Sequence, residues 1–192
     1  MERNDIITTS EGYRDVAVQT GIVFATNRAS PHRVHVYDSS TWRRLREIPV
    51  PCCSAEPYSL HTLHALDDRI LLCCFTKEKL YLLSHSGELL QTHGRSRREA
   101  TADDIIGQTA FGKPMYRAGI LSGPRLCQVD AGGSALVADR FHPRLQLMRS
   151  DGKWTILDLT FGPEMGGIEY AIWCGETLYV VSTIGKVNFL MF

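Results

Sequence analysis

Arginine side chains gather at three places in the chain and could together form a surface for an acidic partner. Guanidinium groups bind phosphate and carboxylate oxygens through paired hydrogen bonds. Solvated arginines on loops and outer strands are the plainer interpretation of the same pattern. The clusters comprise Arg43, Arg44 and Arg46; Arg95, Arg97 and Arg98; and Arg140, Arg144 and Arg149. The candidate surface for RNA or for a protein partner consists of Arg95, Arg97, Arg98, Arg140 and Arg144.

The other reactive side chains do not have the spacing of a metal site or a catalytic site. The cysteine pairs Cys52-Cys53 and Cys73-Cys74 lack the C-x₂-C spacing of a zinc knuckle. Adjacent strand residues face opposite sides of a sheet, so each pair offers one thiol to a given face, and buried core cysteines are expected. The histidines form no HExxH pattern, and the chain has no G-x-S-x-G elbow and no P-loop. We therefore expect no catalytic residue, no metal and no cofactor.

Short alternating runs predict the strands that must position these side chains. Val34 and Val36 alternate with His35 and Tyr37, which is typical of a strand with one buried face. Two later strands end in polar turns that contain Gly87 and Gly152, and such turns favour a positive φ. No segment has a convincing helical stripe, although Arg97-Arg98-Glu99-Ala100 could form one short turn of helix.

The expected strands fall into four similar units of about 40 residues, each with up to four strands, which is typical of β-propeller blades. Such a sheet cannot bury both faces alone, and stacking around an axis buries them. The sequence therefore predicts one all-β domain over residues 1–192, with about four blades and a partial or atypical closure. The expected blades are 13–50, 57–94, 124–160 and 163–192, and residues 95–123 form an inter-blade loop. The fourth unit ends after three strands, and Asp5–Ser10 could supply its outer strand.

The third unit has four runs in a fixed order, and together they resemble an NHL repeat. These runs are Gly123–Asp130, Ala135–Arg140, Pro143–Leu147 and Asp151-Gly152. In that family a Pro opens the first strand, a V-A-D sequence ends the second and an Arg opens the alternating third. The first and second units resemble the repeat more weakly. The resemblance implies a propeller like the C-terminal domain of tripartite-motif (TRIM-NHL) proteins.

Asp139 ends the second strand of the third unit and has two interpretations, of which the first follows from the NHL resemblance. In the NHL pattern such an Asp braces the turn by accepting backbone N–H groups or by pairing with the following Arg. Propellers of the gluconolactonase type instead hold a divalent cation with a Glu, an Asn and an Asp. Glu56 and Asp139 could provide two of these ligands, but no Asn stands beside Pro124. We therefore expect a structural turn rather than a metal-dependent lactone or ester hydrolase.

The leading functional expectation is a non-enzymatic protein–protein interaction module. The resemblance makes this more concrete, because NHL propellers often form the substrate-recruiting part of tripartite-motif ubiquitin ligases. Some NHL propellers bind single-stranded RNA on a basic face, which gives the first alternative, and lactone hydrolysis is the second. The chain has 21 Lys and Arg against 21 Asp and Glu, so its zero net charge disfavours a strongly basic nucleic-acid binder.

Composition and cysteine usage favour a cytoplasmic protein. No apolar run approaches the roughly 20 residues of a membrane helix, and no hydrophobic stretch follows the N-terminus as in a secretory signal. The six cysteines lie mostly in apolar runs, which is typical of a reduced intracellular protein. We expect protein partners and no membrane association.

Overall fold

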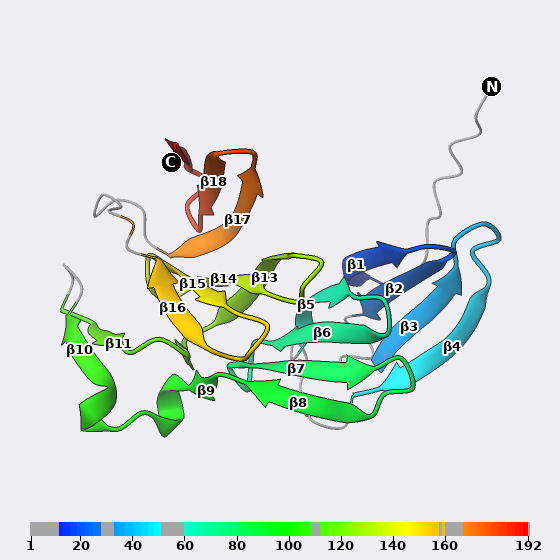
Figure 1. Cartoon of the computed structure of the whole chain (residues 1–192), viewed down its shortest axis with the longest axis horizontal. Coiled ribbons are helices and arrows are strands. Elements are labelled where there is room, and N and C mark those ends of the chain that lie inside the picture. The colour runs from blue at the N-terminus through cyan, green and yellow to red at the C-terminus, as the bar shows by residue number, and fades with distance from the viewer. Residues whose placement is uncertain are drawn as a thin grey trace.

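The computed structural model describes residues 12–27, 33–50, 60–108, 112–157, 159 and 167–191. It shows a β-propeller fold in which four antiparallel sheets follow one another along the chain (Figure 1). Three sheets have four strands and the fourth has three. The expected outer strand at Asp5–Ser10 and the candidate ligand Glu56 lie outside the described residues.

Each sheet is a meander of consecutive strands, because short polar turns join neighbouring strands. Gly87 (φ 94°) and Gly152 (φ 81°) adopt the positive φ that the sequence predicts for two of these turns. Sheet one contains β1 (Tyr13–Gln19), β2 (Ile22–Asn27), β3 (Arg33–Asp38) and β4 (Arg44–Pro49). Sheet two contains β5 (Leu60–Ala65), β6 (Arg69–Cys74), β7 (Lys79–Ser84) and β8 (Leu89–His93). Sheet three contains β13 (Pro124–Val129), β14 (Ala135–Asp139), β15 (Arg144–Met148) and β16 (Trp154–Leu157). Sheet four contains β17 (Ile168–Cys174), β18 (Thr177–Ser182) and β19 (Val187–Met191).

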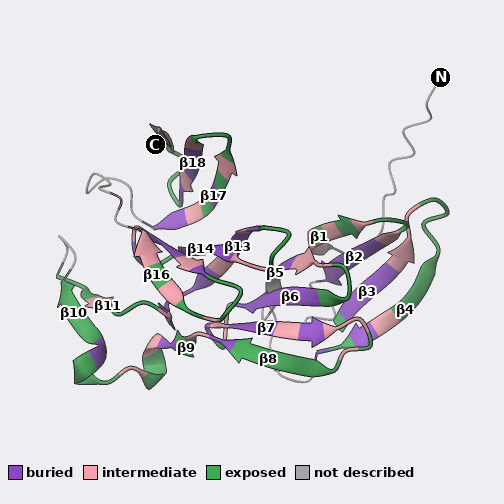
Figure 2. Cartoon of the chain, viewed as in Figure 1, coloured by how far each residue is buried: buried purple, intermediate pink, exposed green. Residues whose placement is uncertain are grey.

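Three hydrophobic clusters fill the spaces between successive sheets. Sheet one packs on sheet two through Phe24 and Leu72, sheet two on sheet three through Leu71 and Val137, and sheet three on sheet four through a third cluster. Alternation within a strand explains the arrangement, since neighbouring residues point to opposite faces. Cys73 and Cys74 accordingly face sheets three and one, both buried, as the sequence predicts. The inner strands are therefore the most buried part of the molecule, as Figure 2 shows for β6 and β14.

The segment between sheets two and three carries more structure than the loop expected there. β9 (Arg95–Ser96) pairs in parallel with β12 (Ile120–Leu121), and β10 (Ile105–Gln108) pairs with β11 (Pro114–Tyr116). Between them lie two short 3₁₀ helices, η1 (Arg97–Glu99) and η2 (Ala102–Asp104). The one helical turn expected after Arg95 is therefore present as η1. This segment brings its arginines next to sheet three.

Candidate functional site

The turn between β14 and β15 is held by a buried ion pair between Asp139 and Arg144. The two residues are directly opposite in the antiparallel register. The Arg144 Nε donates to Asp139 Oδ2 at 3.1 Å, and the Phe141 backbone N–H donates to Oδ1 at 3.4 Å. Burial raises the pKa of Asp139 to about 7, although the Arg144 guanidinium opposes this shift. The carboxylate is thus engaged by the turn itself.

Arg144 is not a surface residue, which corrects its place in the expected binding surface. It is 6% exposed, and its guanidinium donates to the carbonyls of Tyr116 and Ile120, each at 2.6 Å. The guanidinium can be buried here because two carbonyl oxygens and one carboxylate accept hydrogen bonds from its N–H groups. Arg144 therefore ties the inter-blade segment to sheet three.

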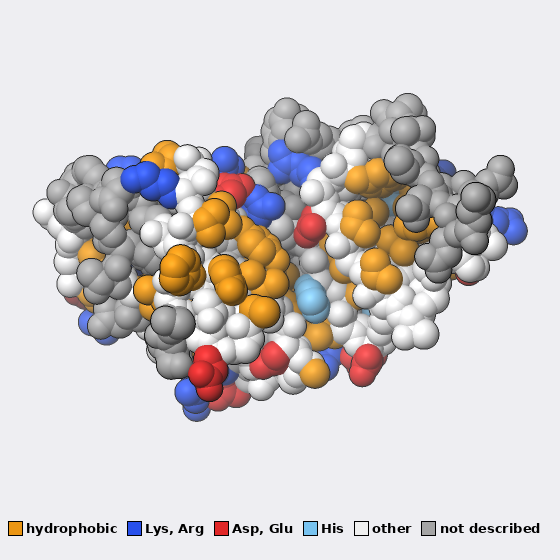
Figure 3. All heavy atoms as spheres, turned by 90° about the horizontal axis from the view of Figure 1, so that it is seen from above, with side chains coloured by type: hydrophobic (Ala, Val, Ile, Leu, Met, Phe, Trp, Pro, Cys, Tyr) orange, Lys and Arg blue, Asp and Glu red, His pale blue; other side chains and the backbone are white. Residues whose placement is uncertain are grey.

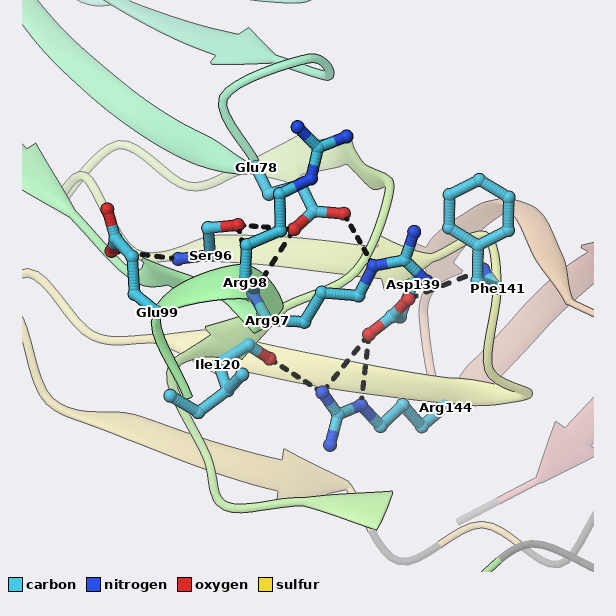
Figure 4. A network of polar contacts seen from close by, with 9 residues as sticks. All are labelled: Glu78, Ser96, Arg97, Arg98, Glu99, Ile120, Asp139, Phe141 and Arg144. Carbon is cyan, nitrogen blue, oxygen red and sulfur yellow. Dashed lines mark hydrogen bonds and ion pairs between the residues drawn. The ribbon is translucent and has the colours of Figure 1, made fainter. Parts of the chain in front are cut away.

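Glu78 extends this network, although nothing in the sequence pattern marks it as a site residue. It lies in the turn between β6 and β7, is buried, and has a positive φ of 53°. Its carboxylate accepts from Ser96 Oγ at 2.5 Å and from the Arg97 backbone N–H at 3.1 Å. Its other oxygen pairs with Arg97 Nε at 3.1 Å. Figure 4 shows Glu78, Ser96, Arg97, Asp139 and Arg144, which we call the rim network.

An arginine–aromatic pair lies on the outside of the rim network. The Arg97 guanidinium is 4.9 Å from the centroid of the Phe141 ring, and Phe141 is 40% exposed. A second ring, Phe75, lies 5.8 Å from Phe141. The Phe141 ring can lie this close to the backbone because residue 123 is glycine, since a Cβ there would be 2.6 Å from Phe141. The pair is therefore both accessible and firmly supported.

Most of the candidate arginines already have an acidic partner. Arg95 pairs with Asp104 at 2.5 Å, and Arg140 pairs with Glu169 at 3.1 Å. Arg97 and Arg144 pair with carboxylates of the rim network. Arg98 is exposed, and within the described part of the chain its guanidinium has no ion-pair partner. The structure thus brings Arg97, Arg98 and Arg144 to one place but neutralises much of their charge locally.

His142 is a buried titratable side chain beside the same turn. Its ring packs edge-on against Tyr116 at 5.9 Å, and its Nδ1 has no hydrogen-bond partner among the described residues. Burial lowers the pKa of His142 to about 4, and the positive charges of Arg144, Lys113 and Arg97 add to the shift. His142 is therefore neutral at physiological pH.

The described residues do not place a metal-ligand set around Asp139. No group of three or more His, Cys, Asp or Glu side chains that could hold a metal ion occurs among them. The Asp139 oxygens face Arg144 and the Phe141 N–H rather than an open channel.

In the same described part of the chain, no helix is long and apolar enough to cross a membrane.

Solved structures that resemble this chain share its fold at low sequence identity. No family model matches the chain, and no curated protein matches it. A chain of a nidogen/laminin complex matches with a TM-score of 0.63 and 15% identity over 95% of this chain and 61% of that chain. The computationally designed Ika4 protein matches with a TM-score of 0.53 and 9% identity over 100% of this chain and 99% of that chain. BamB from Moraxella catarrhalis matches with a TM-score of 0.51 and 16% identity over 92% of this chain and 42% of that chain.

These likenesses concern the β-propeller fold alone. The chain spans 61% of the nidogen/laminin-complex chain and 42% of the BamB chain, so it is shorter than either. The expected NHL family is not identified by any of the comparisons. Among known proteins, then, the chain is similar to propellers, and its fold is the property it shares with them.

Proposed function

We propose that this protein is a non-enzymatic protein-binding module whose contact surface is the rim formed by Arg98, Arg140, Phe141 and the outer side of Arg97. One observation carries the proposal: the exposed Arg97–Phe141 pair stands on the buried rim network. Arginine and aromatic side chains are enriched at the energetic centres of protein interfaces. Because their support is fixed before binding, little conformational entropy would be lost on contact.

The charge distribution favours a protein over RNA as the partner of this rim. RNA binding takes much of its affinity from arginines that neutralise phosphates. Here Arg95, Arg97 and Arg140 each lie beside a carboxylate, which would repel a phosphate backbone. A protein surface with mixed polar and apolar groups can match such a rim without displacing the carboxylates.

The fold supports the same proposal at a coarser level. The nidogen/laminin match belongs to a complex between proteins, so a propeller of this kind takes part in protein contacts there. A more specific proposal is that this domain recruits substrates for a tripartite-motif ubiquitin ligase. That proposal depends on the NHL resemblance of the third unit alone. A cytoplasmic setting is part of the proposal and is consistent with the free thiols of Cys73, Cys74 and Cys127.

Affinity capture with a rim variant tests the proposal. The 192-residue chain and the double variant Arg98→Glu with Phe141→Ser serve as baits in extracts of the source cells, with and without nuclease. Trp42→Ser is the matched control, because Trp42 is also a large exposed aromatic but lies in the turn between β3 and β4. We expect a protein that the wild type and the control retain and that the rim variant loses, with no effect of nuclease.

Two results would contradict the proposal. Identical sets of retained proteins for the wild type and the rim variant would remove the rim as the contact surface. Binding of a single-stranded RNA oligonucleotide that weakens steeply with salt, and that the rim variant abolishes, would favour the RNA alternative instead.

A further inference from the structure

The last strand of sheet four has the sequence pattern of a strand with two neighbours, although no described strand pairs with its outer edge. In sheets one to three, the third strand pairs with the second strand on one side and with the fourth on the other. In sheet four, β19 is the third strand and pairs only with β18 among the described strands. In all four sheets, a basic residue and then apolar residues at alternate positions form the start of the third strand: Arg33-Val34-His35-Val36, Lys79-Leu80-Tyr81-Leu82, Arg144-Leu145-Gln146-Leu147 and Lys186-Val187-Asn188-Phe189.

The outer edge of β19 also lacks the features that protect an outer strand from further pairing. The outer strand of sheet one, β4, contains charged residues and a proline, which discourage the addition of another strand. β19 (Val187–Met191) contains no charged residue and no proline, and its register against β18 has no shift. An apolar, regular strand edge of this kind can pair with another chain through its main-chain N–H and C=O groups.

A strand added to this edge would extend the hydrophobic cluster between sheets three and four. Leu157, Leu159 and Leu190 pack against that cluster and are only partly buried. Leu190 lies on β19 and faces sheet three, because it is opposite Leu178 in the register. Every second side chain of an added strand would lie on this same face. Figure 3 shows further hydrophobic side chains gathered over sheet four. The added strand should therefore have apolar residues at alternate positions.

The charge at the start of β19 indicates a second feature of the added strand. In sheets one and two, the corresponding basic residue has a glutamate partner on or after the fourth strand. Arg33 pairs with Glu47 on β4, and Lys79 pairs with Glu99 at 2.8 Å. The Lys186 side chain is exposed, and within the described part of the chain no carboxylate pairs with it. Because the C-terminal end of an antiparallel partner would lie beside Lys186, a carboxylate is expected there.

We propose that the outer edge of β19 is a second binding site, which takes an extended peptide segment of a partner protein as an antiparallel fourth strand. Main-chain hydrogen bonds would provide the affinity, and the alternate apolar side chains and the carboxylate near the C-terminal end would provide the specificity. The added segment would complete the four-stranded pattern of sheets one to three. The site uses none of the rim residues and does not depend on the function of the rim.

Peptides with methylated main-chain amides test the pairing directly. The probe is a fluorescent synthetic peptide with blocked ends, in which threonine and valine alternate and glutamate is the last residue. Two derivatives carry N-methyl groups on either the valines or the threonines. Since a strand edge pairs with every second residue of its partner, one derivative should bind the 192-residue chain nearly as well as the parent peptide. The other should bind at least about tenfold more weakly, because it loses several main-chain hydrogen bonds.

Two results of this titration would overturn the proposal. Equal binding of the two methylated derivatives would show that the peptide is not held as a strand. Failure of the parent peptide to bind would mean that another segment occupies the edge of β19 or that the edge accepts none.

A charge exchange tests whether the peptide lies beside Lys186. Lys186→Glu should weaken binding of the parent peptide about fivefold, and a peptide that ends in lysine should bind this variant more tightly than it binds the wild type. Lys153→Glu is the control and should bind like the wild type, because Lys153 is also an exposed lysine that directly precedes a strand, with 80% of its side chain exposed. Equal losses in both variants would remove Lys186 from the site and overturn the proposal. A wild type that sediments at twice 21.5 kDa, and that Lys186→Glu returns to 21.5 kDa, would also overturn it, since a second copy would then occupy the edge.

Discussion

Sheet three and sheet four share one strand pattern but differ in how many neighbours they have. In β14, Ala135 and Val137 face sheet two while Leu136 and Ala138 face sheet four, and all four are buried. In β18 one set of residues is buried and the alternate set remains partly exposed. Apolar alternation alone therefore does not decide burial. Sheet four packs on one other sheet among the described elements, and its outward face stays exposed.

The turn that joins the second and third strands also differs between sheet three and sheet four. Sheet three uses the buried Asp139–Arg144 pair, which also reaches two carbonyls of the inter-blade segment. Sheet four uses the Ser182 hydroxyl, which accepts the Lys186 backbone N–H at 2.9 Å. Mutation of the buried ion pair in sheet three should therefore lower the free energy of unfolding more than mutation of the neutral hydrogen bond in sheet four.

Removing the charged brace should have the largest effect on stability. Arg144→Met leaves the Asp139 carboxylate buried without its guanidinium, and we expect a loss of about 3–5 kcal/mol in the free energy of unfolding. Ser182→Ala removes one neutral hydrogen bond and should cost about 0.5–1.5 kcal/mol. Urea unfolding of both variants measures the difference. Equal losses would contradict the distinction between the two turns.

Asp139→Asn should have an intermediate effect. It keeps the shape of the side chain but removes a charge-assisted acceptor, so we expect a cost of about 1–3 kcal/mol. Added Ca²⁺, Mn²⁺ or Zn²⁺ should raise the melting temperature of neither the wild type nor the variant. A metal-dependent rise in the wild type that the variant loses would instead identify Asp139 as a ligand.

The pH dependence of stability should separate His142 from Asp139 beside the same turn. The pKa of His142 falls to about 4 on folding, so its contribution to stability is present above pH 6.5 and is lost as the pH falls toward 4. The pKa of Asp139 rises to about 7, so its contribution is present below pH 3.8 and is lost as the pH rises toward 7.

His142→Phe isolates the first of these contributions. We expect the wild type to lose about 2–4 °C more in melting temperature than this variant between pH 6.5 and 4, for a difference of roughly 1 kcal/mol. Asp139→Asn should keep the acid-side loss, because it leaves His142 in place. Parallel pH curves for the wild type and His142→Phe would show that His142 is not buried in its neutral form.

The contrast between the sheets also explains how much the sequence could predict. The strands of sheet three follow from local alternation, and β14 has the expected bounds, Ala135–Asp139. The burial of Arg144 could not be predicted locally, because its acceptors at Tyr116 and Ile120 lie in a different segment. The role of Glu78 could not be predicted from the sequence either. A positive φ is rare for Glu, and its partners Ser96 and Arg97 lie in a later segment of the chain.

The smallest effect on folding is expected on the outward face of sheet four, where Tyr179 lies between Ile172 and Phe189. Tyr179→Ser changes a side chain that no described sheet covers, so the free energy of unfolding of the dilute protein should change by no more than about 0.5 kcal/mol. A large loss of stability at low concentration would show that this face is already buried within a single chain.

The central claim is that the outward face of sheet four is exposed within one chain whereas both faces of sheet three are covered, and the thiols of Cys174 and Cys127 report on this difference directly. Cys174 is exposed and follows Tyr170 and Ile172 on the same side of β17. Its alkylation in the dilute native protein can be followed by mass spectrometry. Cys127 is an internal reference, because burial raises the pKa of its thiol to about 11. We predict that Cys174 reacts much faster than Cys127 in the native protein and that the two rates become similar in denaturing urea. Equal rates for the two thiols in the native protein would contradict the claim.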